Sequence, residues 1–136
     1  KLKSTRKGVS THNDFLFQNL IVSTEDRIYI VDFEYAGFNQ RGGILYDIGY
    51  FFVDQLFRTP PITKELYDRF LKSMDKAYKQ TLDRGQIYSA AIAALLVQTW
   101  WGAMRYFSVS KKEQPYYKAY AQKRVRGIFR LVDELK

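Results

Sequence analysis

The chain has 136 residues, of which 46% are hydrophobic and 26% charged, so we expect one globular domain over residues 1–136 and not a disordered chain. It has no cysteine, which excludes a disulfide framework and a thiolate metal site and fits a cytoplasmic location. The net charge is +8. We interpret the basic residues within 118–130 as a solvated helix face, so we do not expect nucleic-acid binding. The longest apolar run, residues 90–97, is too short for a membrane span.

The first third of the chain predicts short strands and loops. Residues 1–10 are polar, basic and without periodicity, which indicates an entry segment. Branched residues at 20–22 and 27–31 flank a polar turn at 23–26 and predict a β-hairpin with a buried second strand. Residues 35–43 predict a loop with several glycines.

The rest of the chain predicts four helices, so the fold class is α+β and mainly α-helical. The first covers residues 45–57; the second begins at an N-cap, Thr63, and stops at residues 83–85. The third, residues 88–106, is apolar nearly all round and is expected to be the central buried helix. The fourth helix begins at Pro115. Apolar side chains recur at helical spacing in the second helix (Tyr67, Phe70, Leu71, Met74, Tyr78) and in the last (Tyr117, Tyr120, Ala121, Val125, Ile128, Phe129, Val132).

An acidic motif precedes the hairpin. Residues 12–19, HNDFLFQN, have the H-x-D-x-x-x-x-N spacing of a kinase catalytic loop. Asp14 would orient the acceptor hydroxyl and take its proton, and Asn19 would offer an amide oxygen to Mg²⁺. His12 would hold the loop together by hydrogen bonds. Taken alone, the HND triplet fits a helix N-cap or a turn equally well.

A second acidic motif, Asp32-Phe33-Glu34, follows the hairpin where a kinase has D-F-G, but Glu34 replaces the glycine. Asp32 would supply an anionic ligand to the Mg²⁺ that accompanies ATP. Glu34 would contribute to a second Mg²⁺ or to the substrate. Because Asp32 ends a strand predicted to be buried, its carboxylate needs a partner or a metal.

Together with IVDFEYAGFNQRG (30–42), YDIGYFF (46–52) and Trp101-Gly102, these motifs resemble the choline/ethanolamine kinase family. That family lies within a wider group of aminoglycoside-phosphotransferase-like kinases. The resemblance covers most of the chain and implies the C-terminal lobe of a protein-kinase-like fold, in which a small β-hairpin carries the catalytic site. It also implies a nucleotide-binding N-lobe of the same protein, which is absent from this sequence. Residues 43–46 depart from the family pattern as a small insertion.

The resemblance further implies where a substrate ammonium binds. A quaternary ammonium has no hydrogen-bond donor, so aromatic faces must hold it. The implied positions are Tyr35, Trp101, Tyr117 and Tyr120, with Phe57 as a fifth. Met104 stands where these enzymes have a second tryptophan, so we expect a weaker preference for choline. Plain core packing is the alternative for each ring.

The expected function is that of an ATP-dependent phosphotransferase lobe acting on the hydroxyl of a small amino alcohol, with ATP and Mg²⁺ as cofactors. The alternatives are an aminoglycoside or other small-molecule kinase, and a non-catalytic lobe that binds a ligand or partner. We expect these 136 residues alone to transfer phosphate at a negligible rate, because phosphoryl transfer depends on positioning.

The sequence allows two structural roles for Asp47. It is either an exposed residue at a helix start, favoured by the helix dipole, or a buried carboxylate that accepts hydrogen bonds from the catalytic loop. The apolar neighbours Ile44, Leu45, Ile48 and Phe51 favour the second reading.

Overall fold

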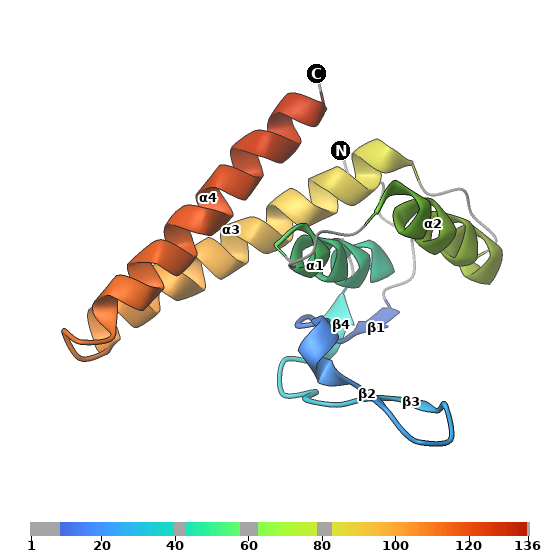
Figure 1. Cartoon of the computed structure of the whole chain (residues 1–136), viewed down its shortest axis with the longest axis horizontal. Helices are drawn as coiled ribbons and strands as arrows, with labels where there is room; N and C mark the ends of the chain where they lie inside the picture. The colour runs from blue at the N-terminus through green and yellow to red at the C-terminus, as the bar shows by residue number, and fades with distance from the viewer. Residues whose placement is uncertain (1–8, 40–42, 58–62, 79–82, 136) are drawn as a thin grey trace.

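The computed structural model describes residues 9–39, 43–57, 63–78 and 83–135. Its helices are α1 (Ile44–Leu56), α2 (Lys64–Tyr78), α3 (Arg84–Ser108) and α4 (Gln114–Glu134), preceded by a short 3₁₀ turn, η1 (Phe17–Asn19), and four strands. Figure 1 shows α3 and α4 side by side, with α1 crossing beneath α3 and the strands lying below α1. The predicted α+β, mainly helical class is confirmed.

The strands form two separate antiparallel pairs. Strand β2 (Leu20–Val22) pairs with β3 (Ile28–Ile30), with Ile21 opposite Tyr29, which confirms the hairpin. Strand β1 (Val9–Thr11) pairs with β4 (Gly37–Asn39), with Thr11 opposite Gly37. Both β1 and β4 lie in segments predicted to be irregular. The strands of the hairpin flank one turn, whereas β1 and β4 join segments far apart in the chain, so no local pattern signals their pairing.

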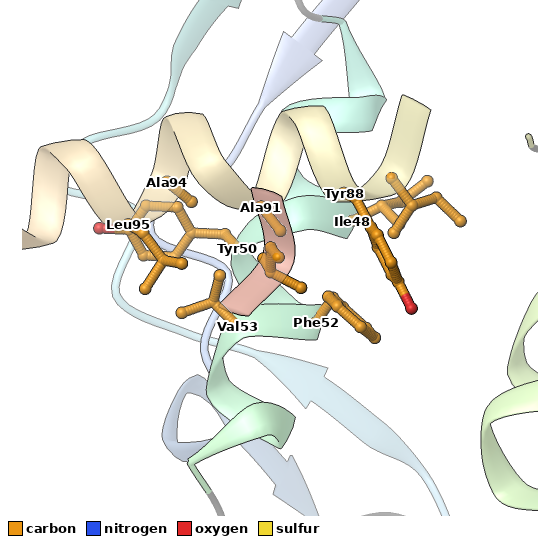
Figure 2. Close-up of a cluster of buried hydrophobic side chains, with 10 residues drawn as sticks. Ile48, Tyr50, Phe52, Val53, Tyr88, Ala91, Ala94 and Leu95 are labelled. Atoms are coloured by element: carbon orange, nitrogen blue, oxygen red, sulfur yellow. The ribbon is translucent and has the colours of Figure 1, made fainter. Parts of the chain in front are cut away.

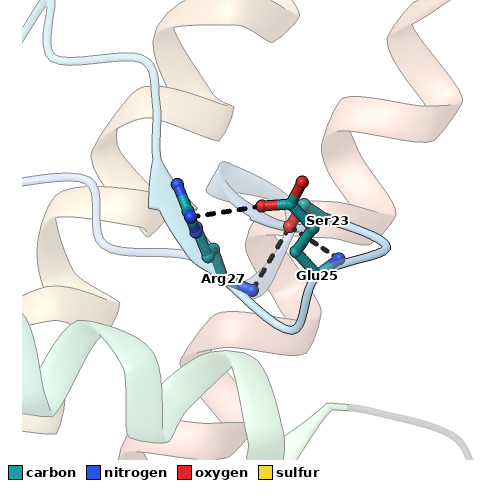
Figure 3. Close-up of polar contacts among 3 residues, drawn as sticks. All are labelled: Ser23, Glu25 and Arg27. Atoms are coloured by element: carbon teal, nitrogen blue, oxygen red, sulfur yellow. Dashed lines mark hydrogen bonds and ion pairs between the residues drawn. The ribbon is translucent and has the colours of Figure 1, made fainter.

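The prediction that the second hairpin strand is buried is wrong. In β3, Ile28 is 66% exposed and Ile30 is 44% exposed, because nothing in the described part of the chain covers the hairpin. Polar contacts close its turn (Figure 3): the Ser23 hydroxyl accepts hydrogen bonds from the backbone N–H groups of Glu25 and Arg27, each at 3.2 Å. The side chains of Glu25 and Arg27 pair at 3.3 Å.

Helices α2 and α3 begin at side-chain caps. Thr63 caps α2 by accepting the backbone N–H of Leu66 at 3.3 Å, as predicted. Helix α3 begins at Arg84 and not at residue 88, because Asp83 accepts the N–H of Gly85 and its own N–H reaches the Gln86 side chain. Residues 83–85, predicted to end the second helix, therefore start the third.

The core lies where α1, α3 and α4 meet. Val53, Ile87, Leu95 and Leu131 have no exposed surface, and Figure 2 shows the α1 and α3 side chains packed together. A Cβ at Gly49 would lie 2.5 Å from the carbonyl carbon of Ala90, so glycine permits the close approach of α1 to α3. From α2, three of the predicted side chains pack onto this core, Phe70, Leu71 and Met74; the side chains of Tyr67 and Tyr78 lie outside the described residues.

Helix α3 is central, as predicted, since it packs against both α1 and α4. It is not buried all round: Trp100 is 69% exposed and Phe107 82% exposed. Among the described helices, α3 is the one long and apolar enough to cross a membrane by length and composition. Core helices of soluble proteins pass the same test, and 44% of the relevant window is buried within this fold.

Candidate active site

Helix α1 holds the loop that carries the first acidic motif. Asp47 accepts the backbone N–H of His12 through Oδ2 and that of Asn13 through Oδ1, both at 2.8 Å. Two turns later, Asp54 accepts the N–H of Phe17 at 3.0 Å. Asp47 is 9% exposed, which confirms the buried reading of this residue. Residues seven apart lie on one helix face, so α1 anchors both ends of the loop.

The same loop is fastened to the segment after the hairpin. The Nε2 atom of His12 lies 2.9 Å from the Val31 carbonyl oxygen, and the Asn13 side-chain amide donates to the Tyr35 carbonyl at 2.8 Å. Because a carbonyl only accepts, Nε2 carries the proton. The other ring nitrogen, Nδ1, is buried with no hydrogen-bond partner among the described residues. These contacts support a structural role for His12.

Two site residues adopt a left-handed backbone, Asn13 with φ 65° and Asp32 with φ 66°. Asn and Asp tolerate this region better than other side chains, although it costs about 1 kcal/mol or more per residue. The hydrogen bonds of Asn13 hold the loop in this conformation. The turn at Asp32 directs the chain out of the hairpin toward the first motif.

The structure brings Asp14, Asn19 and Asp32 together. The Asn19 side-chain amide donates to the Asp14 backbone carbonyl at 2.9 Å, and the Asn19 carbonyl accepts the N–H of Val31 at 3.0 Å, which places Asp32 alongside. Burial raises the pKa of Asp14 above its usual range, a hydrogen bond from Asn19 opposes that rise, and the charge of Asp32 adds to it. Asp14 and Asp32 therefore share one electrostatic site.

Glu34 and Tyr35 lie in the turn closed by the hydrogen bond from the Ala36 N–H to the Phe33 carbonyl, at 2.9 Å. The charge of Glu34 raises the pKa of the exposed Tyr35 phenol, with smaller contributions from Asp14 and Asp32. The Asn13 side chain also binds the Tyr35 carbonyl, so this turn lies beside the loop that carries Asp14.

Three of the predicted aromatic residues form one cluster between α3 and α4. The Trp101 ring lies 5.6 Å from Tyr117 and 5.4 Å from Tyr120, both edge-on. A Cβ at Gly102 would come within 2.8 Å of the Tyr120 ring, so glycine makes room for it. Burial raises the pKa of Tyr120, Arg124 opposes that rise, and the charges of Tyr116 and Asp14 add to it slightly. The cluster packs α3 against α4.

Arginines of the chain itself face these rings. The Arg105 guanidinium lies 6.0 Å from the Trp101 ring centre and 5.5 Å from that of Tyr117. Arg124 lies 3.7 Å from the Tyr120 ring and 4.8 Å from Phe57. The fifth predicted ring, Phe57, is thus joined to the cluster through Arg124.

The donor set near Asp14 suits a hard cation. The described residues contain no group of three or more His, Cys, Asp or Glu side chains arranged to hold a metal ion. Mg²⁺ is usually bound by one or two carboxylates together with substrate phosphates and water. Asp32 and the Asn19 amide oxygen are oxygen donors of that kind, so they fit Mg²⁺.

Sequence reasoning missed three residues, Tyr50, Gln98 and Arg124. Arg124 donates to the Gln98 side chain at 3.1 Å and lies over the Tyr120 ring. Tyr50 and Gln98 are 6% and 4% exposed. A signal existed, since Gln98 interrupts an apolar helix and Tyr50 shares a helix face with Asp47 and Asp54. Their role depends on contacts between three helices, which sequence spacing does not reveal.

Comparison with known proteins agrees with this geometry. The sequence model of the choline/ethanolamine kinase family matches residues 3–126, and the chain belongs to that family. Among solved structures it is similar to the choline kinase LicA from Streptococcus pneumoniae, with a TM-score of 0.65 and 21% identity. The match covers 90% of this chain and 40% of the LicA chain. No curated protein matches. The likeness to LicA shows that the two share a fold.

Proposed function

We propose that this chain carries the catalytic site of an ATP-dependent kinase that phosphorylates the hydroxyl group of a small amino alcohol, such as choline or ethanolamine. The observation that carries this proposal is the grouping of Asp14, Asn19 and Asp32 in a member of the choline/ethanolamine kinase family. This is the constellation that phosphoryl transfer requires: a base beside two ligands for Mg²⁺.

In the proposed reaction, the substrate hydroxyl oxygen forms a bond to the γ-phosphorus of ATP, and the bond from phosphorus to the ADP oxygen breaks. The hydroxyl proton passes to Asp14. The burial that raises the pKa of Asp14 makes it a stronger base than an exposed aspartate. Bound Mg²⁺ would neutralise phosphate charge, with Asn19 and Asp32 as its protein ligands and Glu34 near the substrate or a second ion.

The cluster of Trp101, Tyr117 and Tyr120 supports a cationic substrate, and we expect Tyr35 to contribute a further ring. Because Arg105 and Arg124 already face these rings, the substrate cation meets competing charge. We expect it to be small and singly charged, and to be selected less strongly than by a full aromatic box. The same arginines disfavour a polycationic aminoglycoside, which needs an acidic wall.

A further lobe of the same protein is part of the proposal. The chain spans 40% of the LicA chain, and the β2–β3 hairpin exposes an apolar surface that includes Ile21, Ile28 and Tyr29. An apolar surface of this kind indicates contact with another segment or a ligand. We therefore expect the 136 residues alone to be inactive and the full-length protein to be an active cytoplasmic kinase. A non-catalytic binding lobe is the alternative.

The test is a competition assay on the full-length protein with choline, ethanolamine and an aminoglycoside. We expect phosphorylation of the amino alcohols. In Asp14→Asn, kcat should fall about 10²- to 10⁴-fold, and Asp32→Ala should also raise the Mg²⁺ requirement. Exposed Asp26, in the hairpin turn, supplies the control Asp26→Asn. A preference for the aminoglycoside would reject the substrate assignment, and Mg-ATP binding without turnover would favour the non-catalytic alternative.

A separate experiment tests whether the Trp101 ring binds the cationic group of the substrate. Trp101→Ala should weaken amino-alcohol binding roughly 2- to 30-fold, the equivalent of about 0.5–2 kcal/mol for one cation–π contact. The exposed neighbour Trp100 gives the matched control, since Trp100→Ala removes the same side chain from the outer face of α3. Equal affinity in Trp101→Ala and the wild type would mean that the ring only packs against α4.

A further inference from the structure

Two arginines face the aromatic cluster, and they are held in different ways. The Arg124 guanidinium lies 3.7 Å from the Tyr120 ring centre, and its Nε donates to the side-chain oxygen of Gln98 at 3.1 Å. Gln98 is only 4% exposed, so this hydrogen bond ties Arg124 to the interior of the α3–α4 pair. Arg124 is therefore a fixed support for the Tyr120 ring.

Arg105, in contrast, is held by ring contacts alone. Its guanidinium lies 5.5 Å from the Tyr117 ring centre and 6.0 Å from that of Trp101, near the outer limit of a cation–π contact. The side chain is exposed, and its guanidinium forms no hydrogen bond or ion pair with a described residue. Because an exposed cation–π contact is weak, another cation can replace Arg105 on these two rings.

A cavity beside Tyr117 gives the Arg105 side chain a second place to lie. The cavity has a volume of about 640 Å³ at the turn between α3 and α4 (Figure 1) and is lined by Ser110, Lys112, Glu113, Tyr116 and Tyr117. Glu113 accepts the Ser110 hydroxyl at 2.6 Å through Oε2, while its Oε1 accepts no hydrogen bond from a described residue. The Ser110 contacts lower the pKa of Glu113, and the charge of Arg105 lowers it further, so the carboxylate is ionised at neutral pH.

We propose that Arg105 is a specificity-determining residue that covers Trp101 and Tyr117 while no substrate is bound, and that the substrate ammonium displaces it toward Glu113. This inference rests on the proposed function, because it concerns the same recognition site. Every cation that binds must replace the Arg105 contact. The displaced arginine stays near the ligand, so it disfavours a ligand that carries a second positive charge.

The first test measures the Kd of choline and of tetramethylammonium for the full-length protein by calorimetry. Tetramethylammonium has no hydroxyl group, so its binding does not depend on phosphoryl transfer. In Arg105→Met the competing charge is lost, and the Kd of both cations should fall about two- to fivefold. If Arg105 only packed α3 against α4, the same variant would bind the cations more weakly or equally well, and either result would overturn the proposal.

Two controls separate displacement of Arg105 from general effects of charge and space. Lys112→Met removes a positive charge from the same turn, and Lys112 faces no aromatic ring within the described part of the chain, so the Kd should change less than about 1.5-fold. The neutral analogue 3,3-dimethylbutan-1-ol has the shape of choline without its charge, so its Kd should be the same in Arg105→Met and the wild type. An equal gain from Lys112→Met, or an equal gain for the neutral alcohol, would overturn the proposal.

A double-mutant cycle tests the second position of Arg105. Glu113→Gln removes the alternative partner, so the Kd of tetramethylammonium should rise about twofold in the wild type and stay unchanged in the Arg105→Met background. Equal losses in both backgrounds would mean that Glu113 attracts the ligand directly, which would overturn the exchange. A wild type that binds these cations without phosphorylating choline would reject the proposed function but not this inference, which depends on the Kd values alone.

Discussion

The catalytic segment and the helical body of this domain are stabilised by different interactions. In the helices, the fully buried side chains are aliphatic, such as Val53, Leu95 and Leu131. In described residues 9–39, the buried residues are polar, Thr11, His12 and Asn19, while the large apolar side chains are mostly exposed or half-buried. Apolar packing tolerates small shifts, whereas hydrogen bonds specify direction. The site is therefore attached to a packed body through polar contacts that aim its side chains.

The largest expected effect is a loss of stability in the hydrophobic core of the helices. Leu95→Ala should lower the free energy of unfolding by about 2–5 kcal/mol, because it leaves a cavity among α1, α3 and α4. Urea denaturation measures the loss, and hydrogen exchange should increase in every helix. The exposed Leu96 gives the control, Leu96→Ala, which should change stability little. Equal losses from the two variants would mean that the core does not lie at Leu95.

The next largest loss of stability is expected where α1 holds the loop of the first acidic motif. Asp47→Ala removes the acceptor of two backbone N–H groups and should cost about 2–4 kcal/mol. Hydrogen exchange should increase mainly in residues 11–19, with α3 still protected. Asp54→Ala removes one exposed bond on the same helix face and should cost less. Uniform loss of protection across the domain would show that the site and the body unfold as one unit.

A smaller effect is expected in the hairpin. Ile21 lies opposite Tyr29, and both are about half exposed, so Ile21→Ala should cost less than about 1 kcal/mol in this chain. The same substitution in the full-length protein should cost more, because the proposed further lobe would cover this surface. Comparing Tm shifts of the two forms measures the difference. The same Tm shift in both forms would argue that no further lobe covers this surface.

The smallest expected effect is a gain in stability instead of a loss. The pKa of Asp14 is raised in the folded state, so the ionised carboxylate opposes folding once the pH rises above that pKa. Asp14→Asn should therefore raise Tm slightly at pH 7, although it lowers kcat in the full-length protein. The gain should shrink as the pH falls and both forms become neutral. A lower Tm at pH 7 would indicate that the contacts of the carboxylate outweigh its burial.

Local sequence determined the elements whose signals are short in range. The hairpin, the Thr63 cap and the four helices follow from periodicity and capping residues. The two acidic motifs could be identified because their spacing is itself the signal, and the family match agrees with that reading. The anchoring role of Asp47 could also be inferred, since a carboxylate among apolar neighbours needs donors.

Tertiary structure alone decided the rest. The β1–β4 pair, the exposure of β3 and the outer face of α3 depend on which segments meet and which surfaces stay uncovered. The hydrogen bonds from Arg124 to Gln98 and from Asn13 to the Tyr35 carbonyl join residues from different elements. Periodicity predicts which face of a helix is apolar, but not its partner, because the partner is set by how whole helices pack. The arrangement of the candidate site is therefore a property of the assembled fold.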